Sequence, residues 1–287
     1  MTSQNQWHTQ ILRGGAFRLD GGSMFGIIPK GLWSRWSVPD EHNRIQLQCN
    51  LALLTDGERT VLVEVGFGEK WSAKDRAIFD MENRTSVDAL HDVGVDPHEI
   101  THVIVTHLHF DHAGGLTKWR DQGRGDEGGF EAAFPNATIL TQKREWEDAN
   151  ANRSTMSRTY LKSHLDPIAD QVCLIEGGSE PLPGIRLESM PGHTWGQQAV
   201  SWSDVNRDYV FPGDLCPTIA HVHPAASMAY DMEPWTNMDQ KSKLLTACAR
   251  DGRLILLDHE PGNPLVEVAE SQAHPGRFDL QPIENSG

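Results

Sequence analysis

The sequence lacks the segments that attach a chain to a membrane or export it. No apolar run approaches the ~20 residues that a membrane-spanning helix needs, so no membrane partner is expected. The first ten residues are polar and lack the basic and then apolar pattern of a secretory signal. The four cysteines, Cys49, Cys173, Cys216 and Cys248, are far apart, which excludes a zinc knuckle or a redox pair. Free thiols are typical of a reducing compartment, so a cytoplasmic location is predicted.

Positive charge is also scarce. The chain has 25 Lys and Arg against 40 Asp and Glu, a net charge of −15. Nucleic-acid binding draws its affinity mainly from basic side chains that neutralise phosphates, so no nucleic-acid partner is expected. Hydrophobic residues make up 38% of the chain, with nine Trp and nine Phe, which excludes global disorder. The 287 residues are predicted to form a single domain over 1–287.

Alternating strand and helix patterns run along the chain. The apolar runs 45–55 and 60–65 surround Asp56-Gly57, which predicts a hairpin. A helix at 86–93 with Ser86 as its cap precedes a strand that ends at Thr106. The polar, glycine-rich stretch 117–134 is typical of a surface insertion or lid. Further strands are predicted at 137–141, 172–176, 185–189, 197–203, 207–211 and 254–257, and helices at 142–150, 158–165 and 239–250. This layout predicts two packed sheets covered by helices.

The run His107-Leu108-His109-Phe110-Asp111-His112 directly follows the buried strand that ends at Thr106. It holds three His and one Asp in six residues. His107 and His109 are two apart, so period-two alternation directs both imidazoles to one side. Imidazole ligands suit zinc, iron or another borderline metal rather than Ca²⁺ or Mg²⁺. The run therefore predicts a metal site.

Three further ligand candidates each lie at the end of a predicted strand. His193 lies in Pro191-Gly192-His193-Thr194-Trp195-Gly196, where the glycines permit a tight turn and a close backbone approach to a ligand. Asp214 ends the run 209–214, and His259 ends the run 256–259. Each residue alone is also compatible with a turn, a cap or the surface, but together with the run 107–112 they indicate one centre.

These motifs, HLHFDH, PGHTWG, FPGD and a late DH, occur in the same order as in the metallo-β-lactamase superfamily, which the chain resembles from about residue 45 to 260. The resemblance implies an α+β fold, the αββα sandwich, with two mixed sheets flanked by helices. It also implies a ligand set in which one ion is bound by His107, His109 and His193, a second by Asp111, His112 and His259, and both by Asp214. Glu64 stands where the family usually has Asp; that residue normally lies behind the ligands, so the change affects His orientation or metal affinity.

This ligand set predicts two divalent metal ions per chain, with Zn favoured and Fe, Mn or Co compatible with the same donors. Two such ions lower the pKa of a bridging water to near neutral and supply hydroxide, which attacks an acyl or phosphoryl centre. Asp111 is expected to orient this nucleophile and then carry its proton. Asp258 is either a partner of the ligands or a charged strand end.

The segments 14–26, 215–222 and 228–231 resemble lactonase-like and organophosphate-hydrolase-like members of this superfamily. The homoserine lactonases typically have a Tyr three residues after the bridging Asp, and this position is Pro217 here. His221 or Tyr230 is therefore expected to assist the substrate carbonyl, or no residue does. The expected partner is a small-molecule ester, lactone or organophosphate substrate, and the resemblance implies a homodimer.

Two other classes of protein share these features. A glyoxalase II-like thioesterase or a mononuclear iron sulfur dioxygenase has the same early His motif, and the number and type of bound metals discriminate them from the dinuclear hydrolase. A non-catalytic binding protein on the same fold is the second alternative. The complete ligand set favours the enzyme.

Overall fold

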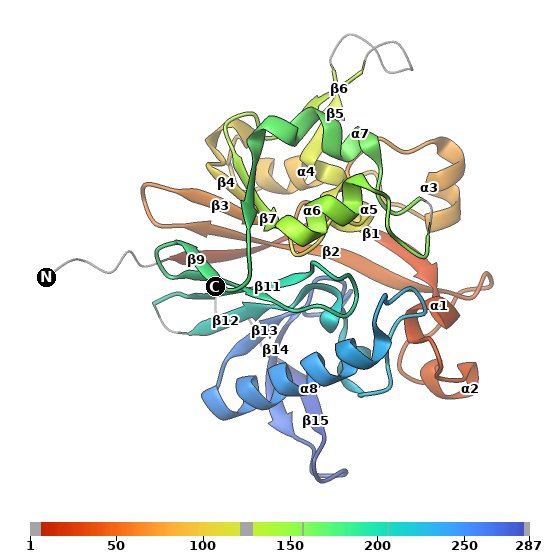
Figure 1. The fold of residues 1–287 in the computed structure, drawn as a ribbon. Helices are drawn as coiled ribbons and strands as arrows, with labels where there is room; N and C mark the ends of the chain where they lie inside the picture. Colours follow the sequence, from red (N-terminus) through yellow and green to blue (C-terminus); the bar gives the residue numbers. More distant parts are fainter. Residues whose placement is uncertain (1–6, 121–128, 157, 206, 284–287) are drawn as a thin grey trace, which may run out of the picture.

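The computed structural model describes residues 7–120, 129–156, 158–205 and 207–283. Within these residues, two mixed sheets pack face to face (Figure 1). The first sheet has six strands in the order β1 (His8–Asp20), β2 (Arg44–Thr55), β3 (Thr60–Val63), β4 (His102–Ile104), β7 (Thr138–Gln142) and β8 (Val172–Ile175). The second has seven, in the order β15 (Phe278–Pro282), β14 (Leu265–Glu270), β13 (Leu254–Leu256), β12 (Asp208–Phe211), β11 (Gln198–Ser203), β10 (Ile185–Ser189) and β9 (Ser179–Leu182).

Helices cover the outer faces of the two sheets (Figure 1). The first sheet carries α3 (Ala73–Phe79), α4 (Ser86–His91), α5 (Phe110–Ala113), α6 (Lys143–Asn150) and α7 (Lys162–Leu165), and the second carries α8 (Pro234–Asp251). The short helices α1 (Gly21–Phe25) and α2 (Lys30–Trp33) follow β1. Short 3₁₀ helices occur at η1 (Pro97–Glu99), η2 (Gly114–Leu116), η3 (Asp166–Gln171), η4 (Gly213–Leu215) and η5 (Ile219–Val222). None of the described helices combines the length and apolar character needed to traverse a bilayer.

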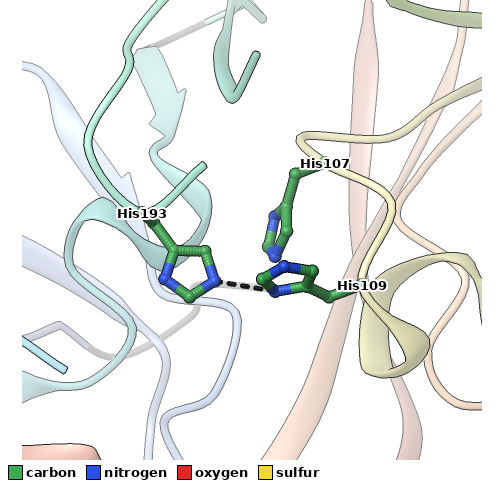
Figure 2. A group of neighbouring side chains, drawn as sticks. All are labelled: His107, His109 and His193. Carbon is green, nitrogen blue, oxygen red and sulfur yellow. Dashed lines mark hydrogen bonds between the residues drawn. The ribbon is translucent and has the colours of Figure 1, made fainter. Parts of the chain in front are cut away.

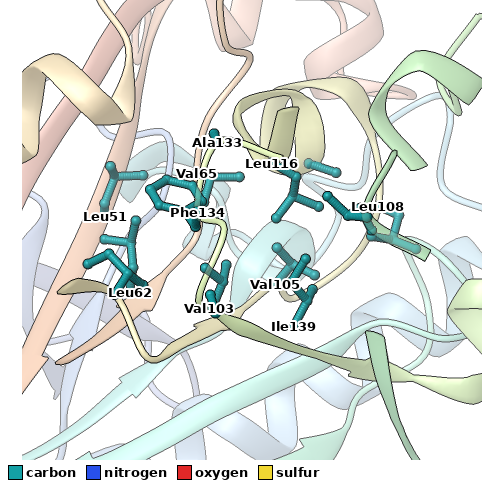
Figure 3. Close-up of a cluster of buried hydrophobic side chains, with 14 of the residues drawn as sticks. Leu51, Leu62, Val65, Val103, Val105, Leu108, Leu116, Ala133, Phe134 and Ile139 are labelled. Carbon is teal, nitrogen blue, oxygen red and sulfur yellow. The ribbon is translucent and has the colours of Figure 1, made fainter. Parts of the chain in front are cut away.

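Alternation along the central strands creates three hydrophobic layers. In β4, Val103 packs with the helices above the first sheet, while Ile104 faces the second sheet (Figure 3 shows the cluster that contains Val103). In β12, Phe211 faces the first sheet and Val210 packs under α8. Successive side chains of a strand point to opposite faces, so strands buried on both faces need continuous apolar runs. These three layers confirm the predicted αββα sandwich.

Several local predictions are confirmed. The hairpin joins β2 to β3, with the backbone amide groups of Glu58 and Arg59 donating to the Asp56 side chain at its turn. The strand predicted at 185–189 matches β10, and the helix predicted at 142–150 matches α6 to within one residue. The four cysteines are free thiols.

Other local predictions are corrected. Ser86 does not cap its helix, because Thr85 accepts the Asp88 amide in a capping box and Ser86 is the first helical residue. The helix predicted at 158–165 is only the four residues of α7. The helix predicted at 239–250 begins earlier, at Pro234, because proline suits the first helical position.

The stretch predicted as an insertion, 117–134, is anchored at both ends. Its flanks pair as β5 (Thr117–Trp119) and β6 (Phe130–Ala132), and Phe134 is buried in the cluster above the first sheet. The intervening residues 121–128 lie outside the described residues, and a lid there stays a prediction.

Candidate metal centre

The predicted ligands lie where strands of both sheets end. The run 107–112 follows β4 of the first sheet, His193 lies between β10 and β11, and Asp214 and His259 follow β12 and β13 of the second sheet. Gly213, with φ of 56°, allows the loop before Asp214 to lie against Thr106, because a Cβ at this position would lie 2.6 Å from the Thr106 side chain. The two sheets thus bring distant parts of the sequence into one centre.

Three imidazoles form the first cluster. His107, His109 and His193 are all buried, and their potential ligand atoms lie within 4.8 Å of one another (Figure 2). His109 Nδ1 is 2.9 Å from His193 Nε2. The ring centroids of His107 and His193 are 4.7 Å apart. This arrangement offers three nitrogen donors to one cation, which is the protein ligand number of many zinc sites.

A second buried cluster lies beside the first. It contains His112, Asp214, Asp258 and His259, again with one potential ligand atom each within 4.8 Å of the others. His112 Nε2 and His259 Nε2 are 3.1 Å apart. Nitrogen and carboxylate donors therefore converge on a second position suited to a cation.

Asp214 connects the two clusters. Its Oδ2 lies 3.1 Å from His193 Nε2, and its Oδ1 lies 3.3 Å from His259 Nε2. The nearby imidazoles hold the pKa of the Asp214 carboxyl well below its usual range, although burial alone would raise it. One carboxylate oxygen consequently faces each cluster in the charged form that binds metal ions.

Asp111 and Asp258 occupy different positions at the second cluster. Asp111 Oδ2 is 3.6 Å from His259 Nε2, beside the second cluster and on the wall of a cavity. Asp258 belongs to the compact cluster itself, with Oδ2 3.9 Å from His112 Nδ1. Its pKa is raised to about 8, chiefly by burial. Asp258 is therefore a partner of the ligands and not a surface strand end.

The pKa values of the clustered imidazoles are shifted in opposite directions. Burial and neighbouring imidazoles hold the pKa values of His107 and His109 well below the ordinary range, so both are neutral and able to bind a metal. Burial also disfavours the charged form of His259, but Asp258 and Asp214 outweigh it and raise the pKa of His259 to about 9. Cations that replace the protons would remove the unfavourable interactions within this group of charges.

Several buried polar atoms support this interpretation. Within the described part of the chain, His107 Nε2, Asp214 Oδ1 and both carboxylate oxygens of Asp258 have no hydrogen-bond partner. Buried polar atoms without a partner cost free energy, and each one needs a physical explanation. Two divalent cations fit both the donor types and the unpartnered atoms.

Other contacts hold the ligands in orientation. Glu64 Oε1 accepts the Thr106 amide at 2.6 Å, and its Oε2 lies 3.3 Å from His112 Nδ1. Its backbone φ of 67° is unusual for a residue with a side chain, and such strain is typical of functional sites. His259 Nδ1 contacts the Gln48 carbonyl at 2.9 Å. These contacts leave Nε2 of His112 and His259 directed into the second cluster.

Glu145 of α6 supports the first cluster, a role that no sequence pattern predicted. Its fully buried carboxylate accepts the Leu108 amide at 2.9 Å and the Thr194 hydroxyl at 2.6 Å. It also accepts the Tyr160 hydroxyl at 3.0 Å. One side chain thus holds the loops of His107, His109 and His193. An acidic residue on an otherwise polar helix carried no signal of this role.

The glycines of the 191–196 turn lie against two helices. A Cβ at Gly196 would lie 2.2 Å from the Glu145 backbone nitrogen, and one at Gly192 would lie 2.6 Å from the Asn237 Cα. They permit close approach of α6 and α8 to the His193 loop, and a close backbone approach to a ligand stays a prediction.

A cavity of about 240 Å³ opens onto the centre. Asp111, Asp214, His109, His259 and Tyr230 line it. The rest of the lining combines the apolar Leu19, Met24, Phe79, Phe110 and Met156 with Asp20, Ser23, Arg158 and Thr159. The cavity therefore suits a small molecule with an apolar part.

His221 and Tyr230 lie in different environments. Tyr230 lines the cavity, with its ring centroid 6.0 Å from that of His193, and its hydroxyl donates to Met24 Sδ at 2.5 Å. His221 is fully buried and does not line it; its Nδ1 contacts the Thr218 hydroxyl at 2.7 Å, and its Nε2 contacts the Met24 carbonyl at 2.9 Å. Both of its nitrogens are therefore engaged, and the contact with Met24 connects His221 to α1.

Comparison with known proteins identifies relatives of this chain. The family model of the metallo-beta-lactamase superfamily matches residues 44–259. An N-acyl homoserine lactonase from Bacillus sp is 31% identical over 160 residues, which are 52% of this chain and 55% of that protein. The chain thus spans about half the length of the curated relatives that it matches.

Solved structures resemble the whole fold. A probable metal-dependent hydrolase from Staphylococcus aureus is 28% identical with a TM-score of 0.84, over 97% of this chain and 98% of that one. AidC, a dizinc quorum-quenching lactonase solved with its product, has a TM-score of 0.77 at 18% identity, over 98% of this chain and 96% of that one. At that identity, the second likeness concerns the fold alone.

Proposed function

This chain belongs to the metallo-beta-lactamase superfamily, and we propose that it is a dinuclear metal-dependent hydrolase that opens lactone rings. The observation that carries the proposal is the pair of buried ligand clusters that Asp214 joins and whose residues His109, Asp214 and His259 line a largely apolar cavity. The partial similarity to an N-acyl homoserine lactonase supports lactones as the first substrate class. Carboxylic esters and phosphotriesters are the next candidates, because their reacting centres are attacked in the same way.

The proposed ligand set is the one that the family resemblance implies. His107, His109 and His193 would hold one ion, and Asp111, His112 and His259 would hold the other. Asp214 lies between the two groups, and Asp258 belongs to the second cluster. Zinc is the proposed metal, and Fe, Mn or Co would accept the same donors. When bound, such ions supply Lewis acidity, which makes water a nucleophile near neutral pH and stabilises negative charge on the substrate.

Asp111 is the proposed group that handles the proton. In lactone hydrolysis, water adds to the ring carbonyl carbon, the ring C–O bond breaks, and the proton from the water ends on the leaving alkoxide. The Asp111 carboxylate faces the cavity beside His259, where it accepts this proton and returns it to the leaving oxygen.

Tyr230 is the proposed donor to the substrate carbonyl oxygen, in place of the tyrosine that Pro217 replaces. Burial, with the charges of Asp214 and Asp111, raises the pKa of Tyr230 well above its ordinary value, so the hydroxyl keeps its proton. A neutral donor beside the reacting carbonyl stabilises the negative charge that develops on it. The apolar wall holds the organic part of the substrate and excludes water.

Metal analysis followed by a substrate panel tests the proposal. We expect two zinc-like ions per chain, and hydrolysis of lactones that a chelator abolishes and Zn²⁺ restores. His109→Ala and Asp214→Ala should lose metal and activity together, whereas the matched surface change His98→Ala should lose neither, since His98 is exposed. Full activity on lactones in both site variants would refute the proposed centre.

The same experiment separates the other candidate functions. A single redox-active iron per chain would favour a sulfur dioxygenase, and preference for thioesters over lactones would favour a glyoxalase II-like enzyme. Two bound metals without hydrolysis of any substrate would favour a non-catalytic binding protein. A homodimer and a cytoplasmic location stay predictions from the sequence.

A further inference from the structure

The loop that carries Tyr230 also contains a buried carboxylate that has no part in the proposed hydrolysis. Asp231 is 5% exposed, and its side chain is completely buried. Its Oδ1 lies 2.7 Å from His193 Nδ1. This contact is on the side of the imidazole opposite Nε2, which faces His109 and Asp214.

The other oxygen of this carboxylate holds its own loop. Asp231 Oδ2 accepts the Ser227 hydroxyl at 2.7 Å and the Met228 amide at 3.0 Å. The same segment is tied to the His193 turn, because the Met232 amide donates to the His193 carbonyl at 3.1 Å. Asp231 therefore joins the His193 loop and the Tyr230 loop through one charged group.

We infer that Asp231 is a positioning residue that fixes His193 for metal binding and, through the 227–231 loop, fixes Tyr230 at the cavity. The inference rests on the proposed metal centre. A carboxylate at Nδ1 requires the proton of the neutral imidazole to be on Nδ1, which leaves the Nε2 lone pair free for a metal. With the ring and the loop both hydrogen-bonded to one side chain, Tyr230 is held at a fixed place relative to His193.

The tautomer of His193 tests the first half of this inference on the unaltered protein. In nitrogen-15 NMR spectra of the zinc-loaded chain, His193 should carry its proton on Nδ1. A proton on Nε2 would overturn the inference, and the measurement does not depend on whether a variant folds.

Metal affinity of Asp231→Asn provides the second test. Three donors converge on the carboxylate, and an amide with a single acceptor oxygen cannot satisfy all three. We expect zinc affinity, measured by competition with a chromophoric chelator, to fall by about 10–100-fold. Asp239→Asn, an exposed aspartate on α8, is the matched control and should leave zinc affinity unchanged.

The outcome separates positioning from ordinary structural support. If Asp231→Asn lowers the Tm of the metal-free chain but leaves zinc affinity unchanged, the inference is wrong. A double-mutant cycle of Asp231→Asn with Tyr230→Phe tests the link to Tyr230. The losses of kcat should be less than additive, and strict additivity would show that Asp231 does not position Tyr230. Measuring zinc affinity and the His193 tautomer needs no substrate. These two measurements therefore test the role of Asp231 even if no lactone is hydrolysed and the proposed function fails.

Discussion

His221 and Tyr230 were alternative candidates from the sequence for one role, and they lie in different environments. Tyr230 lines the same cavity as Asp111 and Asp214. His221 stacks on Phe25, with ring centroids 4.7 Å apart, and both of its nitrogens are hydrogen-bonded. Their positions give the two residues separable predictions.

Tyr230→Phe removes the hydroxyl and keeps the ring. Loss of one donor to a developing oxyanion costs about 10²–10³ in kcat, so we expect a loss of that order on lactones with unchanged zinc content. Steady-state kinetics and metal analysis measure both quantities. Tyr209→Phe, which alters a tyrosine stacked on Trp202 outside the centre, should have little effect. Unreduced kcat in Tyr230→Phe would exclude the hydroxyl as the donor.

His221 should make stability depend on pH. Burial, with the charge of Lys241, lowers the pKa of His221 to about 4, whereas an unfolded histidine titrates near 6.5. Between these values the unfolded chain binds the extra proton, so this contribution to stability is complete above pH 6.5 and is lost as pH falls towards 4. In metal-free protein, His221→Gln should reduce the fall in the urea midpoint between pH 7 and pH 4.5. An equal fall in wild type and variant would contradict this, and His98→Gln serves as the exposed control.

At the scale of elements, α6 is the clearest case of a helix that serves the site. Its residue Glu145 reaches both histidine loops of the first cluster, and Gly196 allows the backbones to come close enough. The 3.6-residue pattern of the segment predicted the helix. It contained no sign that one buried acid would organise two distant loops, because that contact joins residues far apart in the sequence.

Glu145→Gln retains the shape of the side chain but loses its charge and one acceptor. Hydrogen bonds to charged groups contribute about 1.5–3 kcal/mol each, so we expect the free energy of unfolding to fall by about 1–3 kcal/mol and zinc binding to weaken. Urea denaturation and chelator competition measure these effects. Glu147→Gln changes an exposed residue of the same helix and should lower neither the free energy of unfolding nor the zinc affinity. A variant with unaltered stability and zinc affinity would show that α6 does not organise the centre.

At the scale of the whole molecule, the proposed ions would connect the two sheets. His107, His109 and His112 follow a strand of the first sheet, whereas His193, Asp214 and His259 come from the second. Cations bound by both groups stabilise only the folded arrangement, since the unfolded chain does not bring these residues together.

Metal removal should therefore lower the Tm. A ligand at 1,000 times its Kd contributes about 4 kcal/mol, and in chains of this size each kcal/mol changes Tm by roughly 2–4 °C. We expect a fall of about 8–16 °C on chelation, measured by calorimetry, and recovery that increases with the zinc concentration. Complete removal of the metal without a change in Tm would contradict the proposed connection between the sheets.

The sequence alone indicated the αββα class and the positions of the predicted ligands. Local patterns predicted two packed sheets covered by helices and polar residues that directly follow buried strands. The resemblance to the metallo-β-lactamase superfamily implied the αββα sandwich and grouped those residues into one ligand set. The run 107–112, His193, Asp214 and His259 could be located in this way before any distance was known.

Only the tertiary structure decided how the ligands are held and which groups face the cavity. Glu145, Asp231 and the Gln48 carbonyl contact ligands that are distant in sequence, and no local pattern encodes such contacts. Only the structure showed that Tyr230 lines the cavity, that His221 is buried away from it, and that Asp258 lies in the second cluster. The surroundings of a side chain depend on how the two sheets and their helices pack.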